Sequence, residues 1–481
     1  MAMADKHERH HTGLVRRLGT FSAIMVVVAA MIGSGVFKKV SPMSAELGSS
    51  GWVLAAWALA GLVTLAGALT NAEVAGLIAE PGGQYKYFEK MYGRFFAYLY
   101  GWTSFAVIQS ATAASVAYVF AQSVNTLVPL PRLSPEVEAL SIGGIFFPFE
   151  NFGVKGLTIL LIALLTAVNA RGVHWGSSVS NVLSSAVLLA IGLITMLCFG
   201  YSGAQGNFAF DTAGTPIEAQ GLITPLFTAL MAAFWAYEGW NSLGFLGGEV
   251  KSPQKTIPMA LTLGVGIVMA AYVAINAAYL YVLPTAGLLP NPARPNDIAA
   301  VRVVSTFLGQ GGLGLILALI ITATFSSTNN TLMAASRVYF AMAHDGLFFA
   351  KAKVCNRAGV PANALIIQGF WASILVLSGS FDQLTDMLVF AAFLFYGAGA
   401  AGVFVLRARW PEAVRNFKVP FYPVLPGLFV AFCAVLVFVS VQERPREAGV
   451  GLALIASGVP FYWIFERNRK KAASAKASPL I

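Results

Sequence analysis

The sequence predicts an all-α polytopic membrane protein with about 12 transmembrane helices. Of its 481 residues, 57% are apolar and only 11% are charged, and the mean hydropathy is +0.72. Soluble globular chains are about a quarter charged. Long apolar stretches alternate with short polar ones, and about 20 apolar residues span the hydrocarbon layer. The chain therefore has room for about a dozen spans and for no large domain outside the membrane.

Apolar segments define the spans in chain order. Residues 1–17 are polar, and no small-residue cleavage site follows the first apolar run, which we therefore interpret as a retained span and not as a signal peptide. The spans are expected at residues 19–37, 51–78, 95–127, 156–170, 178–200, 222–247, 259–283, 312–342, 363–380, 384–406, 421–441 and 448–465.

The distribution of Lys and Arg predicts the orientation. With these spans, 23 of the 31 Lys and Arg residues fall on the side that holds both termini, and 8 on the other. Short cytoplasmic loops carry the excess of positive charge. We therefore expect a multi-pass protein of the cytoplasmic (inner) membrane with both termini cytoplasmic. The net charge of +10 is then explained by topology, so the partner is the lipid bilayer and not nucleic acid.

Two spans contain sequences that interrupt a helix. The first contains Ile-Gly-Ser-Gly at residues 32–35, and the sixth contains Trp-Ala-Tyr-Glu-Gly at residues 235–239. Each glycine costs a helix interior up to about 1 kcal/mol relative to alanine. An interruption at membrane depth is tolerated only where the backbone is buried in protein or lines a cavity. The alternative is that Gly33 and Gly35 only allow two helices to pack closely.

The positions of the two interruptions favour a binding site. They fall in the first helix of each half of the chain, which is typical of transporters built from inverted repeats. A helix that restarts after Gly33 presents N–H donors to a carboxylate. Free carbonyls at Met31, Trp235 and Glu238 suit an ammonium group. Donors on one side and acceptors on the other predict a zwitterionic ligand, which is an amino acid.

Five segments together carry a family resemblance. They are the interruption at residues 32–37, Pro-Gly-Gly-Gln-Tyr to Tyr-Gly at 81–93, Phe-Trp-Ala-Tyr-Glu-Gly-Trp-Asn to Ile-Pro at 234–258, Ser-Arg and Asp-Gly-Leu-Phe at 336–348, and Phe-Lys-Val-Pro-Phe-Tyr-Pro at 417–423. In this order they resemble the amino acid–polyamine–organocation superfamily, closest to its L-type amino-acid transporter branch. The resemblance covers almost the whole chain.

The resemblance implies a LeuT-like fold with two inverted five-helix repeats. The first repeat is expected at residues 19–200 and the second at 222–406. The last two spans follow at 421–465, and cytoplasmic tails are expected at 1–18 and 466–481. Substrate is expected at the midplane, between spans one, three, six, eight and ten.

The resemblance also implies a set of site residues. Ser34 and Gly35 are expected to bind the substrate carboxylate through their backbone. Trp235 stands where an aromatic gate closes over the substrate from outside. Thr331 stands where an arginine–agmatine exchanger has a tryptophan, so that pocket is not reproduced. The full expected substrate-binding set is Met31, Ile32, Gly33, Ser34, Gly35, Trp235, Ala236, Glu238, Gly239, Asn241 and Thr331.

Glu238 allows three interpretations, because an acid at mid-membrane is costly unless it is paired or protonated. It can face a cationic substrate side chain, as an aspartate does in one relative. It can carry a coupling proton. It can also pair locally, with a tyrosine or with the interrupted backbone, as a structural acid. Glu73 and Glu249 are expected to be structural.

A dedicated coupling cation is not evident from the sequence. Several family members carry a lysine in span five that replaces a sodium ion, and Val187 takes that place here. Ser326 and Ser327 are candidate cation ligands, but hydroxyls in such helices commonly bond to the preceding turn. We expect no metal site and no cofactor. Residues 128–155 contain no cysteine, so a disulfide-linked ancillary subunit is not expected; the oligomeric state stays open.

The function predicted from these features is secondary active transport of amino acids by alternating access. Exchange and proton-coupled uptake both remain open, and a polyamine or organic-amine transporter of the same fold is the alternative. An enzyme is not expected, because the chain lacks His-Glu-x-x-His and Gly-x-Ser-x-Gly motifs, and three of its five histidines lie in the N-terminal tail. The particular amino acid and the direction of transport stay open.

Overall fold

The computed structural model describes residues 16, 18–142, 146–171, 177–206, 208–212, 214–290, 298–356, 359–378 and 381–477. Within this part the protein is helical and forms no strand, although Leu18–Val250 and Ile142–Phe146 form isolated β-bridges. Most of the predicted N-terminal tail and the last four residues of the predicted C-terminal tail lie outside the described residues.

Nine helices of the described part are long and apolar enough to cross a membrane. They are the continuous helix Arg94–Leu127, α4 (Ser50–Leu77), α9 (Phe152–Ala170), α10 (Ser177–Phe199), α14 (Pro253–Val282), α16 (Ala299–His344), α18 (Phe381–Arg409), α19 (Val424–Glu443) and α20 (Pro445–Ala477). Three shorter apolar helices are α1 (Thr20–Met31), α12 (Ile223–Ala236) and α17 (Ala362–Ser378). Each of these helices overlaps one of the predicted segments.

Short helices complete the connections between these elements. They are α2 (Gly35–Lys38), α3 (Val40–Leu47), α5 (Gln84–Tyr92), α8 (Pro135–Glu138), α11 (Pro216–Gln220), α13 (Ser242–Phe245), η3 (Gly247–Glu249), α15 (Thr285–Leu288) and η4 (Ala350–Lys353). Several long helices extend beyond their predicted spans, and α16 and α20 extend furthest. Helix α16 includes an additional segment at its N-terminal end, which begins at Ala299 and is joined to the rest through the non-helical residue Gly309. Helix α20 continues past residue 465 to Ala477.

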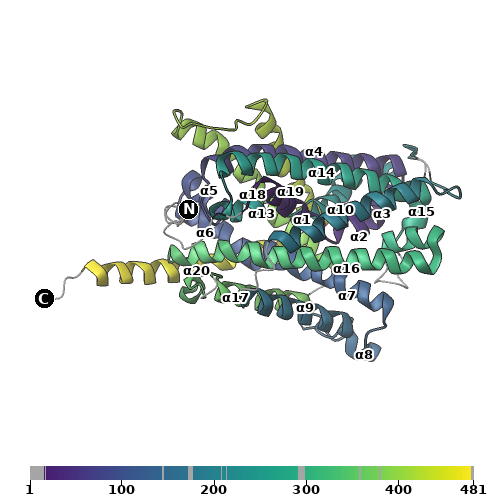
Figure 1. The fold of residues 1–481 in the computed structure, drawn as a ribbon, viewed down its shortest axis with the longest axis horizontal. Coiled ribbons are helices and arrows are strands. Elements are labelled where there is room, and N and C mark those ends of the chain that lie inside the picture. Colours follow the sequence, from purple (N-terminus) through teal and green to yellow (C-terminus); the bar gives the residue numbers. More distant parts are fainter. Residues whose placement is uncertain are drawn as a thin grey trace, which may run out of the picture.

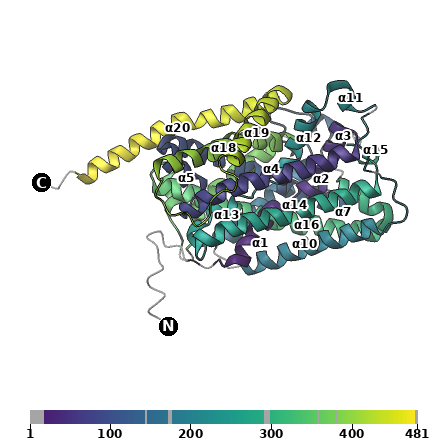
Figure 2. The ribbon, with the colours of Figure 1, turned by 90° about the horizontal axis from the view of Figure 1, so that it is seen from above.

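The long helices form one bundle, in which α4 lies beside α14 and α7 (Gln109–Leu127) lies beside α16 (Figure 1). Several of the connecting helices lie at its two ends. Figure 1 places α5 at one end and α8 and α15 at the other, and Figure 2 places α11 with α15. In both views α20 projects from the α5 end. The loop of α5, predicted to lie on one side of the membrane, and the loops of α8, α11 and α15, predicted to lie on the other, are therefore at opposite ends of the bundle.

The helix Arg94–Leu127 contains a π-helical turn, η2 (Ser104–Ile108), between α6 (Arg94–Thr103) and α7. Such a turn displaces backbone carbonyls from the regular hydrogen-bond ladder. Side chains of neighbouring helices use two of them. The Tyr339 hydroxyl donates to the Ser104 carbonyl at 3.3 Å, and the Trp371 Nε1–H donates to the Ala106 carbonyl at 2.9 Å. These bonds fix the helix Arg94–Leu127 against α16 and α17 beside the candidate site.

Candidate functional site

The first predicted interruption is confirmed. Helix α1 ends at Met31, residues 32–34 are non-helical, and α2 begins at Gly35. Ile32 leaves the helical region with ψ 87°, and the Gly33 N–H turns back to the Met31 carbonyl at 2.8 Å. The chain then continues through α2 and α3 toward the end of the bundle that holds α15. The interruption is therefore a local unwinding within one membrane-length segment.

The second predicted interruption is also confirmed. Helix α12 ends at Ala236, and α13 begins only at Ser242. Gly239 has φ 100°, a left-handed conformation that is costly for residues with a Cβ atom. Glu238 immediately precedes this glycine and therefore lies in the unwound turn itself.

The two interruptions contact each other through their glycines. A Cβ atom on Gly35 would lie 2.5 Å from the Cα of Ala236, and one on Gly239 would lie 2.6 Å from the Ala30 carbonyl oxygen. The Tyr272 hydroxyl on α14 joins the two segments, because it donates to the carbonyls of Met31 at 2.7 Å and of Ala236 at 3.1 Å. Close packing and helix interruption, which the sequence presented as alternatives, thus occur together.

Unpaired polar atoms gather at the interruptions. In the described part of the protein, the main-chain N–H groups of Ser34, Gly35 and Val36 have no hydrogen-bond acceptor, as expected for the first donors of a restarting helix. Four buried side-chain atoms also lack a partner there: Ser34 Oγ, Trp235 Nε1, Asn241 Oδ1 and Ser327 Oγ. Buried polar groups are normally satisfied. This concentration indicates a place where a polar ligand supplies the missing partners.

The carbonyls expected to bind an ammonium group differ in their availability. The Met31 carbonyl already accepts from Gly33 N–H and the Tyr272 hydroxyl, and the Trp235 carbonyl accepts from Glu238 N–H at 3.2 Å. The Glu238 carbonyl has no donor among the described residues. Of the three expected acceptors, it is the one that is free in this arrangement.

The Glu238 carboxyl group pairs with a tyrosine. Its side chain is buried, and its two oxygens accept from the Tyr396 hydroxyl on α18 at 2.7 and 2.8 Å. None of the ion pairs within the described residues includes Glu238. The geometry of the third interpretation, a local pairing with a tyrosine, is therefore present. The roles in substrate or proton binding stay predictions.

The remaining expected residues lie on the elements that surround the interruptions. Asn241 donates to Gln84 Oε1 of α5 at 3.2 Å. Ser326, Ser327 and Thr331 are buried on α16. A Cβ atom on Gly33 would lie 3.1 Å from Ser327 Oγ, which places this part of α16 directly against the first interruption.

An aromatic and basic cluster covers the site on the α3 side. The Trp235 ring packs edge-on against Phe381 with ring centroids 5.9 Å apart. The ammonium groups of Lys38 and Lys39 lie 4.2 and 4.7 Å from the centroid of the Phe381 ring, within the range of a cation–π contact. Trp235, the predicted gate residue, is thus part of a larger group of side chains that closes the site on this side. We call this group, which consists of Trp235, Phe381, Lys38 and Lys39, the Phe381 cluster. It joins the end of α2 to the start of α18.

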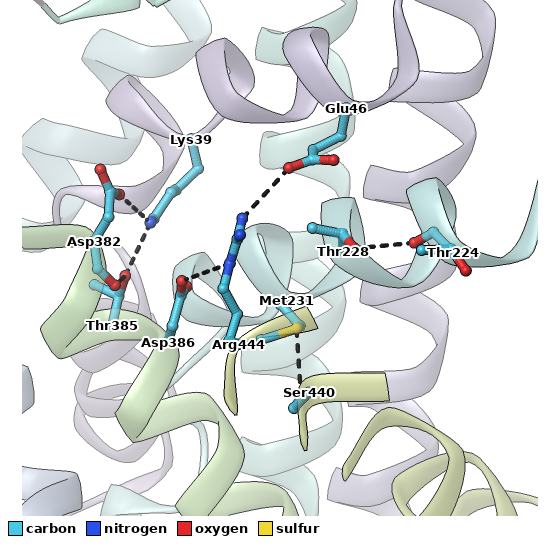
Figure 3. A network of polar contacts seen from close by, with 10 residues as sticks. All are labelled: Lys39, Glu46, Thr224, Thr228, Met231, Asp382, Thr385, Asp386, Ser440 and Arg444. Carbon is cyan, nitrogen blue, oxygen red and sulfur yellow. Dashed lines mark hydrogen bonds and ion pairs between the residues drawn. The ribbon is translucent and has the colours of Figure 1, made fainter. Parts of the chain in front are cut away.

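Ion pairs stabilise the closed arrangement at the Phe381 cluster (Figure 3). Lys39 is only 2% exposed, and its ammonium donates to Asp382 at 2.8 Å and to Thr385 at 2.9 Å. Beside it, Arg444 contacts Glu46 of α3 at 3.4 Å and Asp386 of α18 at 3.3 Å. Three parts of the chain, α2–α3, α18 and the α19–α20 connection, are therefore held together at this end.

We expect Asp382→Asn to open this end of the protein. A buried ammonium that loses its counter-ion is strongly destabilised, and Lys39 becomes hydrated only if the Phe381 cluster separates. In a background without Cys198, Cys355 and Cys433, a cysteine at Ser34 should react about tenfold faster with an impermeant thiol reagent, which corresponds to about 1.4 kcal/mol. Glu150→Gln is the control, because it also removes a carboxylate from a buried lysine, Lys155, at 3.7 Å. Unchanged labelling in Asp382→Asn would contradict the closure.

The opposite end is closed by a second set of contacts. Arg337 on α16 pairs with Glu249 at 3.1 Å, and Leu18 exchanges backbone hydrogen bonds with Glu249 and Lys251. Lys86 on α5 pairs with Asp345 at 2.6 Å. Burial lowers the pKa of Lys86, but hydrogen bonds and the charges of Asp345 and Glu89 outweigh this and raise it above its ordinary value. The site is therefore covered from both ends.

Sequence reasoning missed several residues that shape the site. Tyr272 and Tyr396 occur in apolar spans, where a tyrosine is indistinguishable from a core aromatic. Lys39 and Asp382 were counted among loop residues, because the predicted spans end at 37 and begin at 384. The signal that was available is the pair of adjacent lysines directly after the first interruption.

Comparison with known proteins gives a consistent result. The model of the amino acid permease family matches residues 18–465. The chain is 28% identical over 480 residues to the b(0,+)-type amino acid transporter 1 of Homo sapiens, covering 99% of this chain and 93% of the relative. It is 29% identical to the serine/threonine exchanger SteT of Bacillus subtilis, covering 95% and 98%, and 29% identical to the human cystine/glutamate transporter, covering 94% and 85%.

Proposed function

Because this chain belongs to the amino acid permease family, we propose that it is a secondary transporter that moves amino acids across the cytoplasmic membrane by alternating access. The names of its relatives describe amino acid transporters and exchangers. One observation carries the proposal to this chain: two interrupted helices meet and leave donors and acceptors unpaired at the same place. A zwitterion satisfies both.

This arrangement supports the residue assignments of the proposal. The substrate carboxylate accepts from the free N–H groups of Ser34 and Gly35. The substrate ammonium donates to the free Glu238 carbonyl, with the carbonyls of Met31 and Trp235 beside it. Trp235 covers the bound substrate on the side of the Phe381 cluster. Ile32, Ala236, Gly239, Asn241 and Thr331 complete the wall of the site.

We also propose the topology of the chain in the membrane. Twelve spans are formed when α1 to α3 and α12 to η3 are counted as one interrupted span each. The interrupted spans then open two five-helix repeats related by inversion, with α19 and α20 as an added pair. The end that holds α5 faces the cytoplasm together with both termini, which agrees with the excess of Lys and Arg on that side.

The two closures support alternating access. Separation of the Phe381 cluster admits substrate from outside, and separation of the Arg337–Glu249 and Lys86–Asp345 contacts releases it inside. We favour exchange over cation coupling, because no basic residue replaces a sodium ion in α10, where Val187 is buried. If transport were coupled to a cation instead, Ser326 and Ser327 would be its ligands.

Uptake into proteoliposomes tests the proposal. Purified protein is reconstituted with and without a mixture of unlabelled amino acids inside, and labelled amino acids are offered outside. We expect uptake that depends on the internal amino acids. Uptake into empty vesicles driven by an acidic exterior would establish proton coupling in place of exchange. Uptake of labelled putrescine without uptake of any amino acid would replace the proposal by organic-amine transport.

Glu238→Gln separates the interpretations of this residue. If the carboxylate attracts cationic side chains, the substitution should weaken competition by lysine at least about tenfold, or 1.4 kcal/mol, while competition by leucine is unchanged. The measurement is inhibition of labelled amino acid uptake by each compound. An equal loss for lysine and leucine would contradict the charge-pairing role and would leave the structural or proton-binding role.

A further inference from the structure

The carboxyl group of Glu238 has a single side-chain partner among the described residues, and that partner is Tyr396. One hydroxyl of α18 donates to both carboxylate oxygens, at 2.7 and 2.8 Å. Glu238 itself lies in the unwound turn between α12 and α13 and is only 6% exposed. The contact therefore connects the proposed substrate site to a helix outside the two interruptions.

Packing fixes the position of this hydroxyl. The Tyr396 side chain is buried, and its ring centroid lies 5.1 Å from that of Trp240 in the second interruption and 5.7 Å from that of Phe393 on α18. A tyrosine ring has few rotamers, and contact with two neighbouring rings leaves the hydroxyl little freedom to move. Tyr396 is thus a fixed donor directed at Glu238.

The contact supplies a hydrogen bond but no positive charge. A buried carboxylate is strongly disfavoured unless a cation compensates it, and no ion pair within the described residues does so. A carboxylate offers about four lone-pair positions on its two oxygens. The hydroxyl occupies one position on each oxygen and leaves about one on each, so a cationic group that approached Glu238 would share both oxygens with Tyr396.

We propose that Tyr396 is a specificity-determining residue that restrains Glu238 and thereby disfavours amino acids with cationic side chains relative to neutral ones. The inference rests on the proposed function and adds to it the residue that sets the charge preference. Tyr396 acts through Glu238 and is a positioning residue. Its removal frees the position that the hydroxyl occupies on each oxygen of the acid for a lysine or arginine side chain, without changing the backbone groups that hold the zwitterion.

Tyr396→Phe tests this directly, because it removes one hydroxyl and keeps the ring. The readout is the ratio of the lysine and leucine concentrations that halve uptake of a labelled neutral amino acid. We expect the ratio to shift about tenfold toward lysine, the size of one hydrogen bond to a charged group. Tyr339→Phe is the matched control, since it removes a buried hydroxyl that donates to a main-chain carbonyl, and its ratio should equal that of the wild type.

A double variant and a binding measurement test the proposal further. In the double variant Tyr396→Phe with Glu238→Gln the gain for lysine should disappear, because no charge remains to be freed. If Tyr396→Phe folds but does not transport, thermal stabilisation of the purified protein by lysine and by leucine measures the same preference, and Tyr396→Met provides a second variant. A ratio equal to that of Tyr339→Phe overturns the role of Tyr396. Absence of any amino acid uptake or binding by the wild type overturns the proposed function instead.

Discussion

Gly35→Val is expected to abolish amino acid uptake while the protein still inserts and folds. Even a Cβ atom at this position would lie 2.5 Å from the Cα of Ala236, and a backbone atom cannot rotate away as a flexible side chain can. Valine therefore forces the two interruptions apart at the point where the proposed carboxylate donors lie. We expect uptake to fall at least about a hundredfold, which corresponds to about 2.8 kcal/mol.

Gly192→Val is the matched control, because a Cβ atom on this glycine of α10 meets no atom within 4 Å. It places the same side chain in an apolar helix without a clash and should transport like the wild type. Size-exclusion profiles and uptake in proteoliposomes are measured for both variants. Normal uptake by Gly35→Val would mean that the proposed site is misplaced.

Glu73→Gln is expected to produce the largest loss of stability. Glu73 of α4 is only 3% exposed and accepts from Arg407 Nε at 2.9 Å and Nη2 at 2.7 Å. It also pairs with Arg415 at 3.1 Å and accepts from the Val419 N–H at 2.7 Å. Removing one partner of a buried ionic network costs about 3 kcal/mol or more, because the remaining charges stay buried. The melting temperature in detergent should fall by several degrees.

Glu466→Gln provides the comparison for this prediction. Glu466 pairs with Arg469 at 2.6 Å within α20, and the arginine side chain is 33% exposed. Such pairs contribute about 1 kcal/mol or less, so the melting temperature should barely change. If Glu73→Gln and Glu466→Gln melted at the same temperature, the network would not hold α4 to α18 as the geometry indicates.

The helices and their interruptions were predictable because each depends on local sequence. Apolar length marks a span, and glycines around Ser34 and after Glu238 mark an unwound turn, whatever the rest of the chain does. The extensions of α16 and α20 were missed for the same reason. Their added turns are polar or contain glycine, so hydropathy placed the ends of the helices where the apolar residues end.

The closures and the hydroxyl bridges were not predictable, because each depends on which helices are neighbours. Tyr272 reaches two carbonyls from α14, and Lys39 meets Asp382 343 positions along the chain. One sequence gives no information on such pairs. The motif Asp-Gly-Leu-Phe acquires a physical reason only in the structure, where Asp345 binds Lys86 and Tyr85 of α5.

The most direct test of the central claim is a density map of the protein with its amino acid bound. Two unwound segments that share one zwitterion predict density between them. The carboxylate should lie within about 3.2 Å of the Ser34 and Gly35 nitrogens, a normal hydrogen-bond distance, and the ammonium near the Glu238 carbonyl. Ligand density elsewhere in the bundle, with the N–H groups of Ser34 and Gly35 still unpaired, would contradict the account.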